Sequence, residues 1–241
     1  MKIFDVLLKK YRSNKITSAN HVADMNIVLH DHKAIYFFIP KVACTSIKKV
    51  CAEALHLLTK STGAKAIHFS VPYPSIPRNE LSCYAHYFKF AFVRNPWDRL
   101  VSCYVNKISK DPSFNSIAFQ NGIFKPWIKY GKFKAGMSFD EFVRVVEKIT
   151  DSDAESHFRS QCTFITNIGG NLIVDFIGRF ENLEKDFEQV SRRIGLPECR
   201  LEKLMTSSRR SDYREYYDEE TKRIVAERYE KDIKMFNYNF E

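Results

Sequence analysis

The stretch "YFFIPKVACTSIKKV", residues 36–50, decides the fold. Its first half belongs to the apolar run "KAIYFFIP" (33–40), which is typical of a strand buried in a parallel sheet. A Pro-Lys pair and four small residues follow, and from Thr45 onward apolar residues recur at helical spacing, with Lys48, Lys49 and Glu53 on the other side. Strand, short loop and helix in this order predict a phosphate-binding loop, although this loop contains no glycine.

The rest of the chain repeats the alternation of strands and helices. Strands are expected at 64–69, 89–94 and 171–181, and helices at 95–108, 138–149, 182–195 and 218–236. This order predicts a parallel α/β sheet flanked by helices. With no Pro/Gly/Ser-rich linker, residues 1–241 are expected to form one domain, with an N-terminal helical extension at 1–32 and an irregular insertion at 110–136.

Composition narrows the class of partner. The chain has 38 basic and 29 acidic residues and a net charge of +9, which favours an anionic partner: a nucleotide, nucleic acid, an acidic glycan or a membrane surface. Six cysteines without zinc-finger or disulfide-scaffold spacing indicate a reduced, intracellular protein. No apolar run reaches the 18 residues of a membrane span, so a soluble chain is expected.

The loop after the first predicted strand departs from the Walker pattern. That pattern places Lys directly before the hydroxyl residue, whereas Lys41 comes four residues before Thr45. The small residues Ala43, Cys44, Thr45 and Ser46 would let backbone N–H groups approach an anion closely. The alternative is an ordinary turn in which Thr45 or Ser46 merely caps the helix. The missing Gly-Lys-Ser/Thr argues against an ATPase or kinase and favours an anion handled without a metal.

A second strand end carries another group suited to phosphate. Arg94 ends the strand 89–94, and Ser102 lies off the apolar stripe of the helix that follows. The guanidinium fork fits a phosphate, but Arg94 pairing with Asp98 is the alternative. Two such strand ends in one sheet favour a nucleotide with two separated phosphate groups.

"PKVACTSIK" followed by "FVRNPWDRLVSCY" resembles sulfotransferases that use 3′-phosphoadenosine 5′-phosphosulfate (PAPS), most of all the carbohydrate group that includes the chondroitin and HNK-1 enzymes. The likeness extends over about residues 33–238. It implies a P-loop-like sulfotransferase fold and a reaction without a metal. The donor would be PAPS, which leaves as adenosine 3′,5′-bisphosphate (PAP), and the acceptor would be a hydroxyl of a carbohydrate or glycolipid. The resemblance assigns two groups of residues to the donor. The 5′-phosphosulfate loop consists of Lys41, Val42, Ala43, Cys44, Thr45 and Ser46. The 3′-phosphate pair consists of Arg94 and Ser102.

Sulfuryl transfer also needs a cation at the leaving oxygen and a base for the acceptor proton. Lys41 is the expected cation, and His68 is the first candidate base because it closes the predicted strand 64–69 at the edge that carries Lys41 and Arg94. The resemblance also implies a catalytic His at this spacing before Arg94. His86 precedes a strand, so a structural role at the opposite edge is expected.

Three further groups are assigned to the acceptor side. His157, in "ESHFRSQ", matches a His-aromatic segment of the carbohydrate group, and Glu155 is a reserve base. Arg210, with its neighbour Arg209, would reach a nucleotide phosphate or an acidic acceptor, and a solvated basic loop is the alternative.

Two other functions remain open at this stage. One is an NTP-dependent kinase with a degenerate loop, and the other is a basic nucleic-acid-binding module, disfavoured because the aromatics fall mostly on core positions. An inactive family member is a third possibility. Animal enzymes of the resembling group carry a Golgi anchor that is not seen in this chain, so a bacterial, cytoplasmic enzyme is expected.

Overall fold

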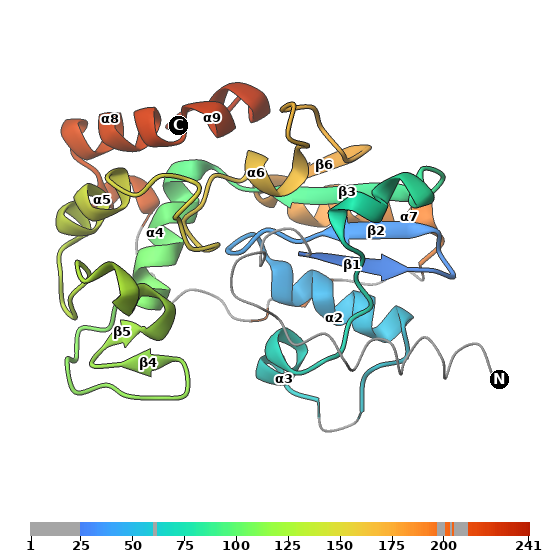
Figure 1. Ribbon diagram of the computed structural model, residues 1–241, viewed down its shortest axis with the longest axis horizontal. Helices are drawn as coiled ribbons and strands as arrows, with labels where there is room; N and C mark the ends of the chain where they lie inside the picture. Colours follow the sequence, from blue (N-terminus) through green and yellow to red (C-terminus); the bar gives the residue numbers. More distant parts are fainter. Residues whose placement is uncertain (1–24, 60–61, 197–200, 203, 205–211) are drawn as a thin grey trace.

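The centre of the protein is a four-stranded sheet, seen in a computed structural model that describes residues 25–59, 62–196, 201–202, 204 and 212–241. The strands are β1 (Asn26–Leu29), β2 (Ala34–Phe37), β3 (Phe88–Val93) and β6 (Phe176–Arg179), in the spatial order β1-β2-β3-β6. β2, β3 and β6 are parallel, and every residue of β2 is buried. The predicted α/β sheet flanked by helices is confirmed (Figure 1).

The prediction of an N-terminal helical extension at 1–32 is wrong for its last residues. Asn26–Leu29 form strand β1, which pairs antiparallel with β2 and is buried throughout. The side chain of Asn26 exchanges two hydrogen bonds with the backbone of Ile76, at 2.8 and 3.0 Å, so a later loop supports this strand. Residues 1–24 of the expected extension lie outside the described residues.

Three of the helices form where their sequence signals predict them. Helix α2 (Cys44–Ala54) follows the loop after β2, and α4 (Pro96–Lys107) is capped by Asn95, which accepts from the backbone N–H of Trp97. Helix α7 (Leu183–Ile194) ends at Gly195, whose φ of 68° is the left-handed conformation that glycine adopts readily. Apolar side chains of α2 and α7 pack into one cluster with the sheet.

The predicted strand at 64–69 is wrong, because these residues form the short helix α3 (Ala64–Phe69). A six-residue apolar run does not distinguish strand from helix by itself, and here Ile67 is buried one helical turn after Ala64. The segment packs beside α2 instead of joining the sheet. His68 therefore reaches the site from a helix.

A second apolar cluster lies on the far side of α4. It includes α5 (Phe139–Glu147), which begins with a capping box between Ser138 and Glu141, within the helix expected at 138–149. The expected last helix is interrupted near Tyr229, giving α8 (Glu219–Arg228) and α9 (Glu230–Phe236). The expected irregular insertion contains a small hairpin, β4 (Phe119–Gln120) and β5 (Ile123–Phe124), and a 3-10 turn around the fully buried Trp127.

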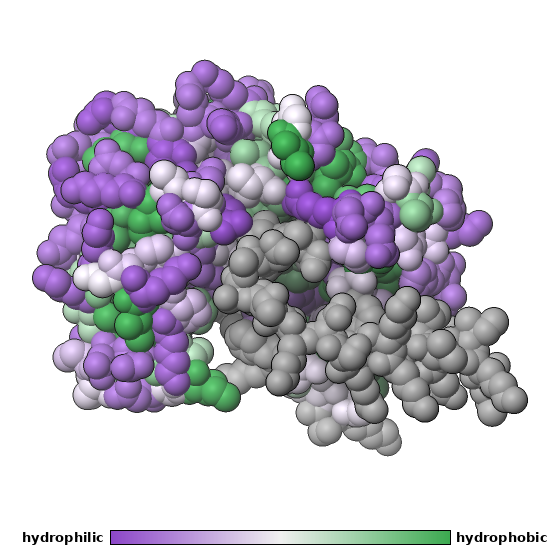
Figure 2. Space-filling view, in the orientation of Figure 1, coloured by the Kyte–Doolittle hydropathy of each residue, from purple (hydrophilic) through white to green (hydrophobic). Residues whose placement is uncertain are grey.

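The outer surface is largely polar. On the face shown in Figure 2, hydrophilic side chains dominate and apolar groups occur as separate small patches. None of the helices in the described part of the chain is both long and apolar enough to cross a bilayer.

The sheet geometry predicts a stability effect at Gly178 in β6. A Cβ there would stand 2.3 Å from the ring of Phe92, so Gly178→Ala should lower the free energy of unfolding by about 1–3 kcal/mol, measured by urea denaturation. Gly63→Ala is the matched control, because its Cβ would meet no atom within 4 Å, and it should change stability by less than about 0.5 kcal/mol. Equal stability of the two variants would contradict this packing.

Candidate active site

The carboxyl ends of the three parallel strands meet at one pocket of about 810 Å³. Pro40 and Lys41 follow β2, Arg94 follows β3, and Phe180 follows β6, and all four line it. Ligands of open α/β sheets bind at this edge, and the volume is in the usual range for a small-molecule site. The predicted strand 171–181 is shorter than expected, since β6 covers only Phe176–Arg179.

The predicted phosphosulfate loop lies at the N-terminus of α2. It makes its turn without glycine by placing Lys41 (φ 71°) and Ala43 (φ 48°) in the left-handed region, where non-glycine residues are strained. Ala43, Cys44, Thr45 and Ser46 line the pocket. The side chain of Val42 instead lies in the apolar core with no exposed surface, so only its backbone is available to a ligand.

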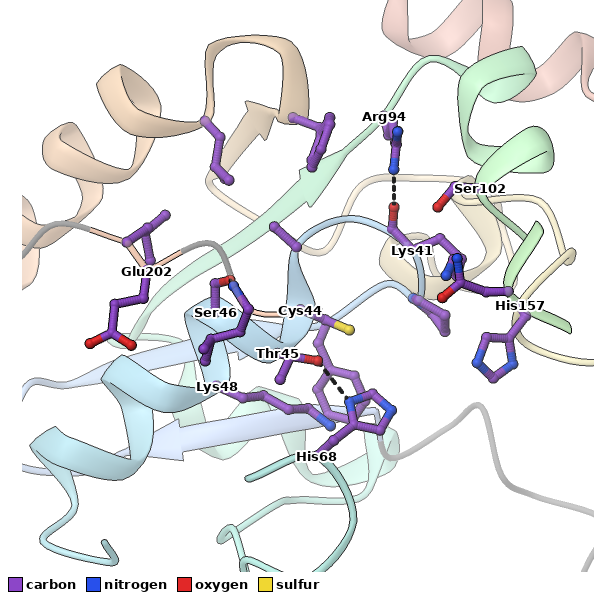
Figure 3. Close-up of a pocket in the computed structure, with 18 of the residues that line it drawn as sticks. Lys41, Cys44, Thr45, Ser46, Lys48, His68, Arg94, Ser102, His157 and Glu202 are labelled. Carbon is purple, nitrogen blue, oxygen red and sulfur yellow. Dashed lines mark hydrogen bonds between the residues drawn. The ribbon is translucent and has the colours of Figure 1, made fainter. Parts of the chain in front are cut away.

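Arg94 adopts the ion pair that the sequence left open and still borders the pocket. Its Nε donates to Asp98 Oδ2 at 2.7 Å, and its Nη1 donates to the carbonyl of Lys41 at 3.1 Å. The guanidinium carbon lies 4.0 Å from the ring centroid of Phe180. Ser102 is buried on α4 and lines the same pocket, beside Lys41 in Figure 3. The two residues expected to hold a 3′-phosphate are therefore together.

His68 reaches the loop through one hydrogen-bond contact. Its Nδ1 lies 3.1 Å from the hydroxyl of Thr45, and its ring lines the pocket (Figure 3). Burial lowers the pKa of His68 to about 3, and the charges of Lys48, His157, Lys107 and Lys41 lower it further in that order. His68 is therefore neutral at pH 7, which is the form that a base requires.

Two lysines of the pocket, Lys48 (buried) and Lys107 (half-buried), are absent from the sequence prediction. Lys48, expected on the outer side of α2, is 6% exposed, and its Nζ lies 3.7 Å from the ring centroid of Phe38. Lys107, at the end of α4, places its Nζ 3.5 Å from the centroid of Phe124. The available signal for Lys48 was its position three residues after Thr45, which puts both on one face of a helix.

Burial also affects the predicted catalytic lysine. It lowers the pKa of Lys41 to about 8, and burial likewise lowers the pKa values of Lys48 and Lys107. Among the residues that the structure describes, no carboxylate forms an ion pair with any of the three ammonium groups. The pocket therefore concentrates positive charge that an anionic ligand would neutralise.

Glu155 and His157 form a half-buried ion pair. Glu155 accepts hydrogen bonds from Trp127 Nε1 at 2.9 Å, Ser156 Oγ at 2.7 Å and His157 Nδ1 at 2.9 Å. Burial opposes ionisation of Glu155, but His157 and these hydrogen bonds together lower its pKa below the usual range. Burial lowers the pKa of His157 to about 4 against the opposing effect of Glu155. His157 lines the pocket, and its assignment to the acceptor side stays a prediction.

The segment that carries this pair is held by α4 and α8. Arg99 of α4 is 2% exposed and donates to three backbone carbonyls: Nε to Pro40 at 2.9 Å, Nη1 to Arg159 at 2.8 Å and Nη2 to Ser156 at 3.1 Å. It thus connects the phosphosulfate loop with the Glu155–His157 segment.

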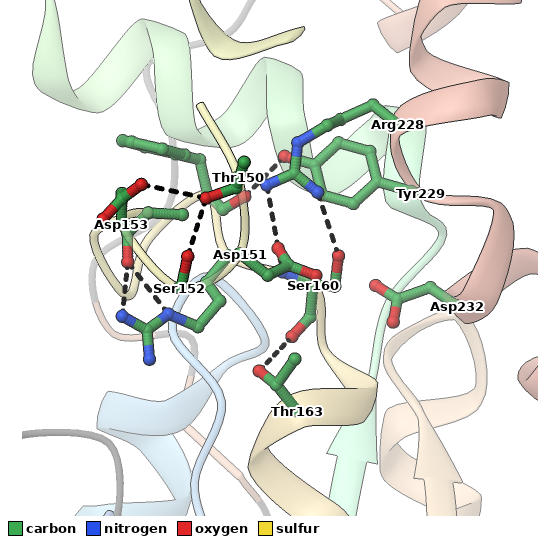
Figure 4. Close-up of polar contacts among 12 residues, drawn as sticks. Thr150, Asp151, Ser152, Asp153, Ser160, Thr163, Arg228, Tyr229 and Asp232 are labelled. Carbon is green, nitrogen blue, oxygen red and sulfur yellow. Dashed lines mark hydrogen bonds and ion pairs between the residues drawn. The ribbon is translucent and has the colours of Figure 1, made fainter. Parts of the chain in front are cut away.

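Figure 4 shows the contacts of the same segment with α8, where Arg228 donates to Asp151 Oδ1 at 2.8 Å and to Ser160 Oγ at 3.2 Å. The hydroxyl of Tyr229 donates to the carbonyl of Phe158 at 2.6 Å. The segment is thus fixed on two sides.

The remaining predicted residues lie elsewhere. His86 is exposed just before β3, at the opposite edge of the sheet, as predicted. Arg210 and Arg209 lie outside the described residues. Within the described part of the chain, no cluster of three or more His, Cys, Asp or Glu side chains has the arrangement of a metal site.

The comparison with known protein families supplies the deciding observation, since the sulfotransferase family matches residues 24–239. The chain belongs to this family. It is a sulfotransferase, and the predicted family and fold are confirmed. The comparison with solved structures found no match.

Among the proteins that the chain resembles are carbohydrate sulfotransferases of animals. The chain is similar to carbohydrate sulfotransferase 11 of Rattus norvegicus (25% identity over 95% of this chain and 70% of the relative). It is also similar to carbohydrate sulfotransferase 14 of Danio rerio (30% over 71% of this chain and 48% of the relative) and carbohydrate sulfotransferase 9 of Homo sapiens (24% over 90% and 54%). The chain thus spans between about half and 70% of the length of these relatives. The expected bacterial origin and cytoplasmic location stay predictions.

The two half-buried histidines of the pocket, His68 and His157, predict a fall in stability in mild acid. The pKa values of His68 and His157, about 3 and about 4, lie below the value of 6.5 expected in the unfolded chain. The unfolded state therefore binds up to about two more protons near pH 5, so stability is complete above about pH 6.5 and falls as the pH is lowered.

Urea midpoints measured from pH 7.5 to pH 5 test this expectation. His68→Asn and His157→Asn should each make the dependence shallower, and His86→Asn is the exposed control. The same pH dependence in all three variants would contradict the burial described for the two rings.

Proposed function

We propose that the protein transfers the sulfuryl group of PAPS to a carbohydrate hydroxyl by in-line displacement without a metal, with His68 as general base. The observation that carries the proposal is one pocket at three strand ends, bordered by the loop of Lys41, by the Arg94–Ser102 pair and by His68. Family membership supports sulfuryl transfer, and the names of the relatives support a carbohydrate acceptor.

The two anion-binding groups of the pocket suit the two phosphate positions of PAPS. Backbone N–H groups at the start of α2 and the hydroxyls of Thr45 and Ser46 suit the 5′-phosphosulfate. Arg94 and Ser102 suit the 3′-phosphate, because the guanidinium is already oriented by Asp98 and Phe180. A donor with phosphate at both positions uses both groups.

The chemical step needs a proton acceptor and a cation. The acceptor hydroxyl oxygen forms a bond to sulfur while the bond between sulfur and the 5′-phosphate oxygen breaks, and PAP leaves with that electron pair. Lys41, in the loop, is suited to stabilise the charge on the leaving oxygen. The hydroxyl proton passes to neutral His68, whose Nδ1 is already in contact with Thr45.

Labelled PAPS and a panel of carbohydrates test the activity directly. Transfer of label to a carbohydrate in the presence of a metal chelator is expected. ATP with Mg²⁺ serves as the rival donor, and phosphorylation of the panel without sulfation would replace the proposal with a kinase.

His68→Ala should reduce kcat by about 10²–10⁴-fold, because the acceptor proton loses its base. The affinity for PAP, measured by calorimetry, should stay within about threefold, since His68 does not belong to the phosphate-binding groups. His86→Ala is the matched control and should keep full activity. An unchanged kcat in His68→Ala would remove this residue from the mechanism.

Arg94→Lys should weaken PAP binding by about 10–100-fold, because a lysine cannot reproduce the oriented fork. Adenosine 5′-phosphate lacks the 3′-phosphate, so wild type and variant should bind it equally. The same loss of affinity for both nucleotides would show that Arg94 does not read the 3′-phosphate.

A further inference from the structure

Lys48 is a buried cation in the pocket that the roles above leave unused. It lies on α2 with 6% of its surface exposed and lines the pocket together with Thr45 and His68. Figure 3 shows its amino end pointing toward the His68 ring rather than along the outside of the helix. Its neighbour Lys49 lies on the outer side of α2, paired with Glu53 and Glu202.

The surroundings of Lys48 only partly compensate for its burial. Its Nζ lies 3.7 Å from the ring centroid of Phe38 and 5.7 Å from that of Tyr73, and an aromatic face attracts a cation. In the described ranges, no carboxylate forms an ion pair with Lys48 and no side-chain or backbone oxygen accepts from its Nζ. A buried charge without a counter-charge destabilises the empty protein, so a bound anion is the partner that this arrangement suits.

The position of Lys48 indicates which anion. It follows Thr45 by three residues, so both face the same side of α2, and His68 contacts Thr45 at 3.1 Å. During in-line transfer the sulfuryl group lies between the leaving oxygen, near the loop, and the acceptor hydroxyl, near the base. Of the atoms of PAPS, the three oxygens of the sulfuryl group are therefore those nearest to the space between Thr45 and His68.

We propose that Lys48 is a catalytic residue that binds the oxygens of the sulfuryl group while it passes from PAPS to the acceptor. The assignment rests on the proposed function and adds to it a second cation, distinct from Lys41 at the leaving oxygen. The bonds that form and break are those given above, and Lys48 keeps its protons throughout.

A second effect of Lys48 agrees with this role. After burial, Lys48 is the largest of the charges that lower the pKa of His68, followed by His157, Lys107 and Lys41. Once a sulfuryl group neutralises Lys48, the positive charge that develops on His68 during proton transfer meets less repulsion. The same contact thus serves the transferred group and the base.

Lys48→Met tests the proposal, because methionine keeps an apolar chain of similar length over Phe38. The variant should lose about 10²–10³-fold in kcat with PAPS. PAP lacks the sulfuryl group, so its affinity should stay within about threefold of wild type. Lys49→Met is the matched control on the same helix and should change neither quantity. A parallel loss of PAP affinity would place Lys48 on a phosphate and overturn the assignment, as would an unchanged kcat.

Thermal unfolding of the ligand-free protein separates this role from a structural one. Removing a buried charge without a counter-charge should leave the melting temperature of Lys48→Met equal to or above that of wild type. A lower melting temperature with retained kcat would show that Lys48 only supports the fold. Lys48→Arg keeps the charge and should retain at least about ten times the kcat of Lys48→Met; equal kcat values in the two variants would also overturn the proposal.

These outcomes are distinct from a failure of the proposed function. Wild-type protein that binds no PAP and transfers no label from PAPS would refute the function itself. An active wild type with an equally active Lys48→Met variant would refute only the role of Lys48.

Discussion

The guanidinium of Arg99 connects the two halves of the site. Its three nitrogens donate to the carbonyl of Pro40, just before the predicted phosphosulfate loop, and to those of Ser156 and Arg159 beside the Glu155–His157 pair. Arg99 lies on α4 and is only 2% exposed, so the surrounding protein leaves its side chain little freedom to move. Three hydrogen bonds of one planar guanidinium therefore tie the residue before the predicted phosphosulfate loop to the Glu155–His157 segment.

Hydrogen bonds between buried polar groups also fix the backbone of Arg94. Gln161 pairs with both backbone groups of Arg94, at 2.9 and 2.8 Å, and so continues the sheet past the end of β3. Asp232 of α9 in turn accepts from the backbone N–H groups of Gln161 and Cys162, at 2.7 and 2.8 Å. Arg94 is thus fixed through its backbone as well as through Asp98, which prepares its fork for an anion before any ligand arrives.

Burial, reinforced by the positive charge of the pocket, explains why its histidines are neutral. Burial lowers the pKa of His68 most, and the charges of Lys48, His157, Lys107 and Lys41 lower it further, so protonating His68 is unfavourable in the empty site. His157 differs from His68 because Glu155 lies next to it and partly offsets burial. A donor carrying several negative charges would change this balance more than any rearrangement of the chain, because the cations are already in place.

Local signals in the sequence were enough for much of the fold. The apolar run before Lys41, the Asn95–Pro96 start of α4, the Ser138–Glu141 box of α5 and Gly195 after α7 each predict an element that forms there, because these signals act within a few residues. The segment 64–69 and residues 26–29 were assigned wrongly. Both are short, and their conformation is decided by packing against α2 and by pairing with β2.

The sequence by itself determined the family motifs, the parallel sheet and the grouping of Lys41, Thr45, Arg94 and Ser102 at one edge, because strand ends and helix starts follow from local pattern. Only the tertiary structure decided that Lys48 and Lys107 turn inward, that Glu155 orients His157, and that Arg99 joins the loop to the acceptor segment. These facts depend on contacts between residues far apart in the chain. The periodicity of a single helix does not report which of its polar side chains another element will bury.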